Sequence, residues 1–194
     1  MPNGETKKDI TRVLQSLDSG SCTSEELLPL VYDELRRLAA ARVASQPARQ
    51  TLQATALVHE AWLRLLDGNG RVWQNRAHFF RAAALAMRQI LVERARKKLS
   101  LKRGARPEYV SIDAVDVADE MPEERILLID EALERLQKKD ADLAQVVMLK
   151  FFVGLTNAQV AEMTGVTERT VQNKWTFAKA WLLKCIQQEM NPDH

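Results

Sequence analysis

Residues 156–181, TNAQVAEMTGVTERTVQNKWTFAKAW, have the pattern of two short helices around a glycine turn. Thr156 and Gln159 are spaced as a capping box that opens the first helix. Gly165 stands where a left-handed turn residue is needed, and Thr167 can cap the second helix. The apolar side of that second helix is formed, at helical spacing, by Val171, Trp175, Ala178 and Leu182.

The spacing within this stretch is typical of a DNA-reading helix-turn-helix. Ala161, Gly165 and Val171 follow at offsets of four and ten, so a small residue lets the helices cross closely and a valine holds the second on the first. The start of such a second helix enters a major groove. A plain helical hairpin is the alternative. The candidate DNA-binding residues are Thr167, Glu168, Arg169, Thr170, Gln172, Asn173 and Lys174.

Length and composition limit the class of protein. With 194 residues, 46% hydrophobic and 28% charged, the chain suits one ordinary domain or two small ones. Few glycines, few prolines and few alternating β-branched residues indicate an all-α fold. The first ten residues do not resemble a secretion signal, and no apolar run is long enough to span a membrane. We expect a cytoplasmic protein.

No catalytic or metal-binding motif is present in the sequence. Cys22 and Cys185 stand far apart without a CxxC pair, so reduced thiols are favoured over a disulfide. His59-Glu60 lacks the second histidine of a zinc-protease helix, and there is no phosphate-binding glycine loop. We therefore expect no catalytic residues, no metal and no cofactor.

The small net charge of +2 conceals a strong segregation of charge. Residues 71–106 contain eleven Lys or Arg and one acid, Glu93, whereas residues 111–142 contain eleven Asp or Glu and four basic residues. Separation of this kind is typical of one element that meets a polyanion and another that does not.

Helical periodicity divides the chain into four parts. Residues 1–22 form an N-terminal extension with one short helix, and residues 23–103 form a first helical domain. Within it, residues 45–50 around Pro47 are interpreted as a loop, and a long helix from about residue 77 to 99 begins apolar and becomes basic. Residues 104–122 form an acidic linker. Residues 123–194 form a second domain that includes the helix-turn-helix.

Aromatic residues precede the basic part of the long helix. The run RARKKLSLKRGAR, residues 94–106, attracts phosphates without reading sequence, and aromatic faces upstream can stack on unstacked bases. Phe79 and Phe80 are neighbours on a helix, so we expect at least one to be core. Trp73 is equally well explained as a structural residue.

Four ordered segments resemble the extracytoplasmic-function (ECF) sigma factors of bacterial RNA polymerase. They are LVYDELRRLAAARV, TLQATALVHEAWLRL, NRAHFFRAAALAMRQILVERARKK and GLTNAQVAEMTGVTERTVQNKWTFAKAWL, and the resemblance covers about residues 27–183. The last segment is similar to the subgroup with a FAxAWL-like sequence. The resemblance implies a non-enzymatic subunit that binds core RNA polymerase, at its clamp coiled coil and flap, and promoter DNA. The resemblance leaves open whether an anti-sigma factor is a further partner.

The resemblance also implies residue roles. The polymerase-binding helix would use Val58, His59, Glu60, Trp62 and Leu63, with Trp62 equally explained as core and His59 and Ala56 departing from the family's usual Gln and Asp. His78 is as well explained by a surface hydrogen bond as by a base contact, and Asn75 would bond an extruded base. The residues expected at the minus-ten element are Trp73, Asn75, Arg76, His78, Phe79, Arg81, Arg88, Arg94, Arg96, Lys97 and Lys98.

The second helix of the terminal segment is less basic than in relatives. Gln172 and Asn173 stand where Lys or Arg is common, which shifts the expected readout toward adenine. Arg169 would bind guanine, and Lys174 would contact a phosphate. Glu168 would either accept a hydrogen bond from cytosine or stabilise the helix N-terminus through the helix dipole. The acidic linker either passes through polymerase channels or is a solubilising spacer. The alternative functions are a free-standing helix-turn-helix regulator and a nucleic-acid enzyme with an unrecognised site.

Overall fold

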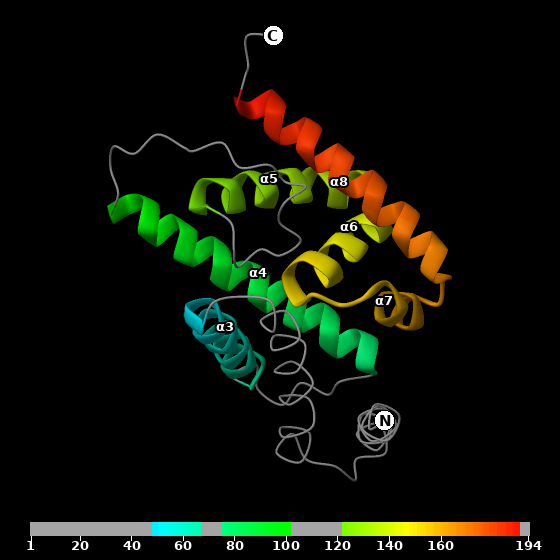
Figure 1. Ribbon diagram of the computed structural model, residues 1–194, viewed down its shortest axis with the longest axis horizontal. Coiled ribbons are helices and arrows are strands. Elements are labelled where there is room, and N and C mark those ends of the chain that lie inside the picture. Colours follow the sequence, from blue (N-terminus) through cyan, green and yellow to red (C-terminus); the bar gives the residue numbers. More distant parts are fainter. Residues whose placement is uncertain (1–47, 67–74, 102–121, 191–194) are drawn as a thin grey trace. The chain divides into compact units, whose positions relative to one another are not determined.

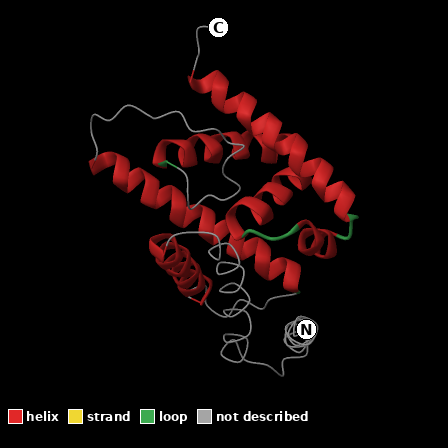
Figure 2. Cartoon of the chain, in the orientation of Figure 1, coloured by secondary structure: helices red, strands yellow, loops and turns green. Residues whose placement is uncertain are grey.

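The computed structural model describes residues 48–66, 75–101 and 122–190. Every regular element in these three stretches is a helix, which confirms the all-α prediction (Figure 2). Several predicted features lie outside them: the N-terminal extension with its short helix, the segment LVYDELRRLAAARV, residues 45–47 of the predicted loop, Trp73, and the linker apart from Pro122.

The chain divides into two compact units between Met87 and Arg88. This boundary falls inside the long helix α4, Arg76–Leu101, so the basic half of that helix belongs to the second unit. The predicted domain limits at residues 103 and 123 stay a prediction.

Helix α3, Ala48–Leu66, supplies the first unit with an apolar stripe. Leu57, Ala61 and Leu65 are buried at helical spacing, and Val58 and Trp62 are buried beside them. The loop predicted over residues 45–50 is wrong for its second half, because the helix already includes residues 48–50. Alanine, arginine and glutamine have high helix propensity, which here outweighs the signal from Pro47.

Helix α4 is one or two residues longer at each end than predicted. In its first half both Phe79 and Phe80 are almost fully buried, with ring centroids 5.5 Å apart in an edge-to-face arrangement. The Trp62 ring of α3 lies 6.4 Å from that of Phe79. Alanines 83, 84 and 86 are also buried, so the first half of α4 has a wide apolar arc rather than a single stripe.

The second unit contains the remaining helices. They are α5 (Glu123–Lys139), α6 (Ala141–Val147), the π-helix η3 (Met148–Val153), α7 (Asn157–Thr164) and α8 (Glu168–Met190). Helix α8 packs on α5, α6 and α7, and α5 also packs on α6 (Figure 1). The core of this unit includes Ile126, Ile129, Leu133 and Leu136 at helical spacing, and Leu143, Val147 and Phe151 after them.

Local chemistry explains where these helices end. Asp140 separates α5 from α6: its N–H donates to the Leu136 carbonyl, and its side chain accepts from the Leu143 N–H at 2.9 Å. After Val147 the helix widens into a π-turn, which stops at Gly154 with φ of 82°. Acidic residues begin α5 and lysines end it, as the helix dipole favours.

Candidate nucleic-acid interface

The turn between α7 and α8 is built as the sequence predicts. Thr156 N–H donates to Gln159 Oε1 at 2.8 Å, and Gln159 N–H donates to Thr156 Oγ1 at 3.2 Å, which completes the capping box. Gly165 adopts a φ of 70°, and its N–H donates to the Ala161 carbonyl at 2.9 Å. The turn thus fixes the direction in which α8 leaves.

Helix α8 has one apolar face and one exposed face. The predicted stripe of Val171, Trp175, Ala178 and Leu182 is buried, and Ile186 extends it. Most of the predicted DNA-binding residues lie on the other side: Thr167, Glu168, Arg169, Gln172 and Asn173 are exposed, and Thr170 and Lys174 are half-buried. The first two turns of α8 therefore present a polar surface to solvent.

Several of these polar residues already have partners. Thr167 Oγ1 accepts from the Thr170 N–H at 3.2 Å, so Thr167 caps α8 as predicted. Gln172 Oε1 accepts from the Asn157 side-chain amide of α7. Lys174 Nζ lies 3.7 Å from Asp142 Oδ2, and the Asp142 side chain is largely exposed. The surface is thus partly organised before any ligand arrives.

The start of α4 uses Asn75 in a way the sequence analysis missed. Asn75 Oδ1 accepts from the His78 N–H at 2.8 Å, and its carbonyl accepts from the Phe79 N–H at 3.1 Å. Asn75 is therefore positioned as the N-cap of α4, and its exposed side chain keeps the Nδ2 end available for another acceptor. An Asn three residues before a His-Phe-Phe run is the signal that could have indicated this cap.

The predicted minus-ten residues in the first half of α4 divide between core and surface. Phe79 is 1% exposed, so in this structure it offers no ring face for a base. Arg76 is also buried, with its guanidinium carbon 5.5 Å from the centroid of the Phe80 ring. His78 is half-buried and Arg81 is exposed.

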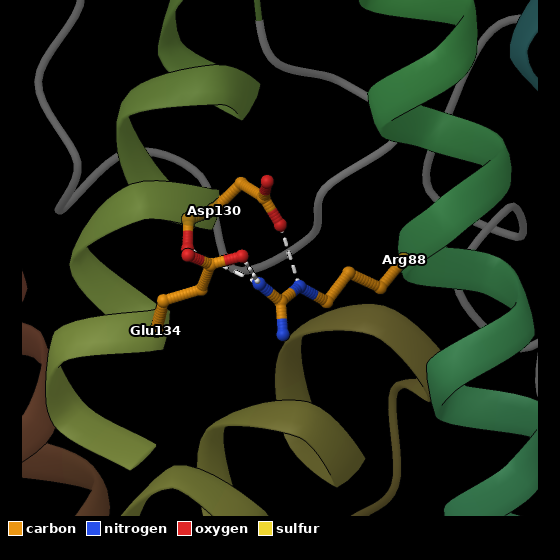
Figure 3. A network of polar contacts seen from close by, with 3 residues as sticks. All are labelled: Arg88, Asp130 and Glu134. Carbon is orange, nitrogen blue, oxygen red and sulfur yellow. Dashed lines mark hydrogen bonds and ion pairs between the residues drawn. The ribbon is translucent and has the colours of Figure 1, made fainter. Parts of the chain in front are cut away.

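The basic half of α4 is joined by ion pairs to acidic residues of α5, the next helix. Arg88 Nε lies 2.6 Å from Asp130 Oδ1, and Arg88 Nη2 lies 3.6 Å from Glu134 Oε1 (Figure 3). Lys98 Nζ lies 2.7 Å from Glu123 Oε1. These two predicted phosphate contacts are thus engaged by carboxylates, whereas Arg96 and Lys97 are exposed and Arg94 is half-buried.

The predicted polymerase-binding residues on α3 also divide into buried and surface residues. Val58 and Trp62 are 4% and 6% exposed, which favours the interpretation of Trp62 as core. His59 and Leu63 are exposed, and Glu60 is half-buried beside Arg64 at 3.5 Å. Of the predicted residues, His59, Glu60 and Leu63 therefore reach the surface of α3, whereas Val58 and Trp62 belong to the core.

Residues 48–66, 75–101 and 122–190 contain no group of three or more His, Cys, Asp or Glu arranged to hold a metal ion. None of the helices in that part of the chain combines the length and apolar character that crossing a membrane requires.

Comparison with known proteins gives one clear match. The model of the family described as ECF sigma factor matches residues 7–188, which is most of the chain. Comparisons with curated proteins and with solved structures gave no significant match. The family consists of transcription initiation factors that are not enzymes. The chain belongs to the ECF sigma factor family.

Proposed function

We propose that this chain binds core RNA polymerase and directs it to promoters with two elements, one read by α8 and one opened near α4. The proposal that α8 reads the upstream promoter element depends on the distribution of side chains on this helix. Its apolar stripe is buried against its own unit, while Arg169, Gln172 and Asn173 are exposed within the first two turns. A helix held from behind in this way can enter a major groove with its N-terminal residues.

The proposal that the downstream element is opened near α4 depends on the N-terminus of this helix and on its basic C-terminal half. Asn75 uses its Oδ1 for the helix cap and is exposed, and Arg81, Arg96 and Lys97 are exposed further along α4. Amide and guanidinium donors suit extruded bases and displaced phosphates. Trp73, which lies outside the described residues, belongs to the same proposed contact set. Phe79 and Arg76 contribute indirectly, by holding the start of the helix in shape.

The polymerase contact is assigned to the outer surface of α3. Leu63 is 48% exposed, and His59 and Glu60 lie on the same side of the helix, one turn before it. Protein interfaces commonly place an apolar side chain at the centre and polar groups at the rim, and Leu63 with its two polar neighbours could supply both. The clamp coiled coil is the proposed partner of this surface.

A reconstitution experiment tests the proposal. Core polymerase mixed with the full chain should start transcription from a subset of a broad promoter library, and the starts should share two elements upstream. Core polymerase alone is the control. The free chain should bind duplex promoter DNA weakly. Tight dimeric binding of the free chain to a palindrome, with no effect on polymerase, would instead support a free-standing regulator and overturn the proposal.

A further inference from the structure

Three polar side chains form a hydrogen-bonded row that ends on the exposed face of α8. Lys150 Nζ, in the π-turn η3, donates to Asn157 Oδ1 at 2.7 Å. Asn157 Nδ2, in the first residue of α7, donates to Gln172 Oε1. The ammonium of Lys150 is further held by the Leu155 carbonyl at 3.5 Å and by the Trp175 ring, whose centroid is 5.5 Å away.

The chemistry of Lys150 sets the direction of every bond in this row. An ammonium group can only donate, so the Asn157 atom that faces it must be the carbonyl oxygen. The Asn157 amide nitrogen then faces Gln172, and Gln172 must turn its own oxygen inward to accept. The orientation of an amide is otherwise ambiguous, because its oxygen and nitrogen have similar shapes. Here the lysine resolves both orientations.

The outward end of Gln172 is therefore Nε2, which is a donor. A glutamine with both ends available pairs with adenine by accepting from N6 and donating to N7. With Oε1 directed at Asn157, that two-bond pairing is lost. Guanine and thymine present only acceptors to an Nε2 donor, adenine presents the N7 acceptor beside an amino group that repels the donor, and cytosine presents the amino group alone.

We propose that Lys150 and Asn157 are positioning residues that make Gln172 a donor-only reader, so that α8 selects guanine or thymine at the base pair that Gln172 meets. This rests on the proposed function, in which α8 enters the major groove of the upstream element. It also replaces the expectation that Gln172 pairs with adenine. Lys150 and Asn157 lie 22 and 15 residues before Gln172 in the chain, and neither needs to touch DNA.

Asn157→Asp reverses donor and acceptor in the hydrogen bond to Gln172 without a large change in side-chain volume. One carboxylate oxygen keeps the bond from Lys150, and the other can only accept, so Gln172 must turn its Nε2 inward. Gln172 Oε1 then faces outward as an acceptor, which matches the amino groups of cytosine and adenine. The holoenzyme with this variant should exchange its preference at one upstream position from guanine or thymine to cytosine or adenine, by about three- to tenfold, as expected for one hydrogen bond.

The test uses core polymerase, the full-length chain and a promoter library randomised across the upstream element, with transcripts sequenced. In a Gln172→Ala background, Asn157→Asp should leave the base preference unchanged, because the reader is absent. Lys150→Met should broaden the preference at the same position, since Asn157 is then free to turn. Thermal unfolding of each variant identifies any loss of fold, and Gln172→Ala alone should remove the preference in a folded chain.

Two outcomes separate this inference from the proposed function. If wild-type holoenzyme initiates at defined promoters but Asn157→Asp changes no base preference, the row has no role in readout and the inference is overturned. If the wild-type chain does not activate polymerase, the proposed function fails first. A neutron structure of the chain alone still tests the row: a deuterium on Asn157 Nδ2 pointing at Gln172 supports it, and the opposite orientation refutes it.

Discussion

Arg88 of α4 and Asp130 of α5 are joined by both a side-chain and a main-chain bond. Arg88 Nε lies 2.6 Å from Asp130 Oδ1, and Arg88 Nη2 donates to the Asp130 carbonyl at 3.2 Å. The two side chains are only 14% and 12% exposed, so solvent screens this pair weakly. Figure 3 shows the Arg88 guanidinium directed at Asp130 and Glu134 of α5. In this structure α5 therefore occupies the place of the phosphate that Arg88 was predicted to contact.

Asp130→Ala should release Arg88 and leave it without its main counter-charge. Breaking a largely buried ion pair should cost about 3 kcal/mol of unfolding free energy, measured in urea. The released guanidinium should strengthen nonspecific binding to duplex DNA. The salt slope, which is the fall in the logarithm of the binding constant with the logarithm of the salt concentration, should become steeper by about one.

Glu131→Ala is the matched control for Asp130→Ala, because Glu131 lies on the same helix but is exposed. It should change the unfolding free energy little. An Asp130→Ala chain that is destabilised but shows an unchanged salt slope would contradict the competition between α5 and phosphate.

Asp142→Asn should strengthen binding to the upstream element. Lys174 Nζ lies 3.7 Å from Asp142 Oδ2, and the loss of this exposed pair should cost at most about 1 kcal/mol in stability. Lys174 is then free to contact a phosphate, so the salt slope of holoenzyme binding should steepen. In a Lys174→Gln background the effect of Asp142→Asn should be much smaller. An equal effect in both backgrounds would mean that Asp142 acts by general repulsion of DNA.

Gly165→Ala should lower the unfolding free energy by about 1 kcal/mol, because an L-residue resists the φ of 70° at this turn. Apart from Gly165 and its two chain neighbours, nothing lies within 4 Å of an ideal Cβ at this position, so the cost is one of backbone conformation and not of a clash. Gly165→Asn should cost less, since asparagine tolerates left-handed backbone. Urea unfolding measures both, and a larger loss for Asn than for Ala would contradict the explanation.

Asn75→Ala and Asn75→Ser should separate the helix cap from a base contact. Alanine removes both and should cost about 1 kcal/mol in stability. Serine can still accept from the His78 N–H but has no amide donor. If Nδ2 binds an extruded base, Asn75→Ser should keep stability and polymerase binding while reducing permanganate reactivity of the opened bases. Normal strand opening in Asn75→Ser would restrict the role of Asn75 to the cap.

Leu63→Ser and Trp62→Ala should differ in what they disturb on α3. Leu63 is 48% exposed, so its replacement should weaken polymerase binding with little change in unfolding free energy. Trp62 is 6% exposed and contacts Phe79, so Trp62→Ala should cost about 3 kcal/mol or more. Polymerase affinity and urea unfolding, measured together, test this division. Full affinity in Leu63→Ser would exclude Leu63 from the docking surface.

Short-range features of this protein were predictable from sequence. The capping box of Thr156 and Gln159, the left-handed Gly165 and the buried stripe starting at Val171 each depend on residues within one or two helical turns. Backbone conformation and helical period decide such features, and both follow from the local order of residue types. The ordered segments also indicated the family, which the match over residues 7–188 established.

What only the tertiary structure decided is which polar groups meet across long separations. Asp130 lies 42 residues from Arg88, and Asn157 lies 15 residues from Gln172. Periodicity indicates which face of a helix is apolar, but not which carboxylate or amide of another helix packs beside a given cation. Those pairings depend on how the helices cross, and they determine which predicted DNA contacts are open and which are already occupied.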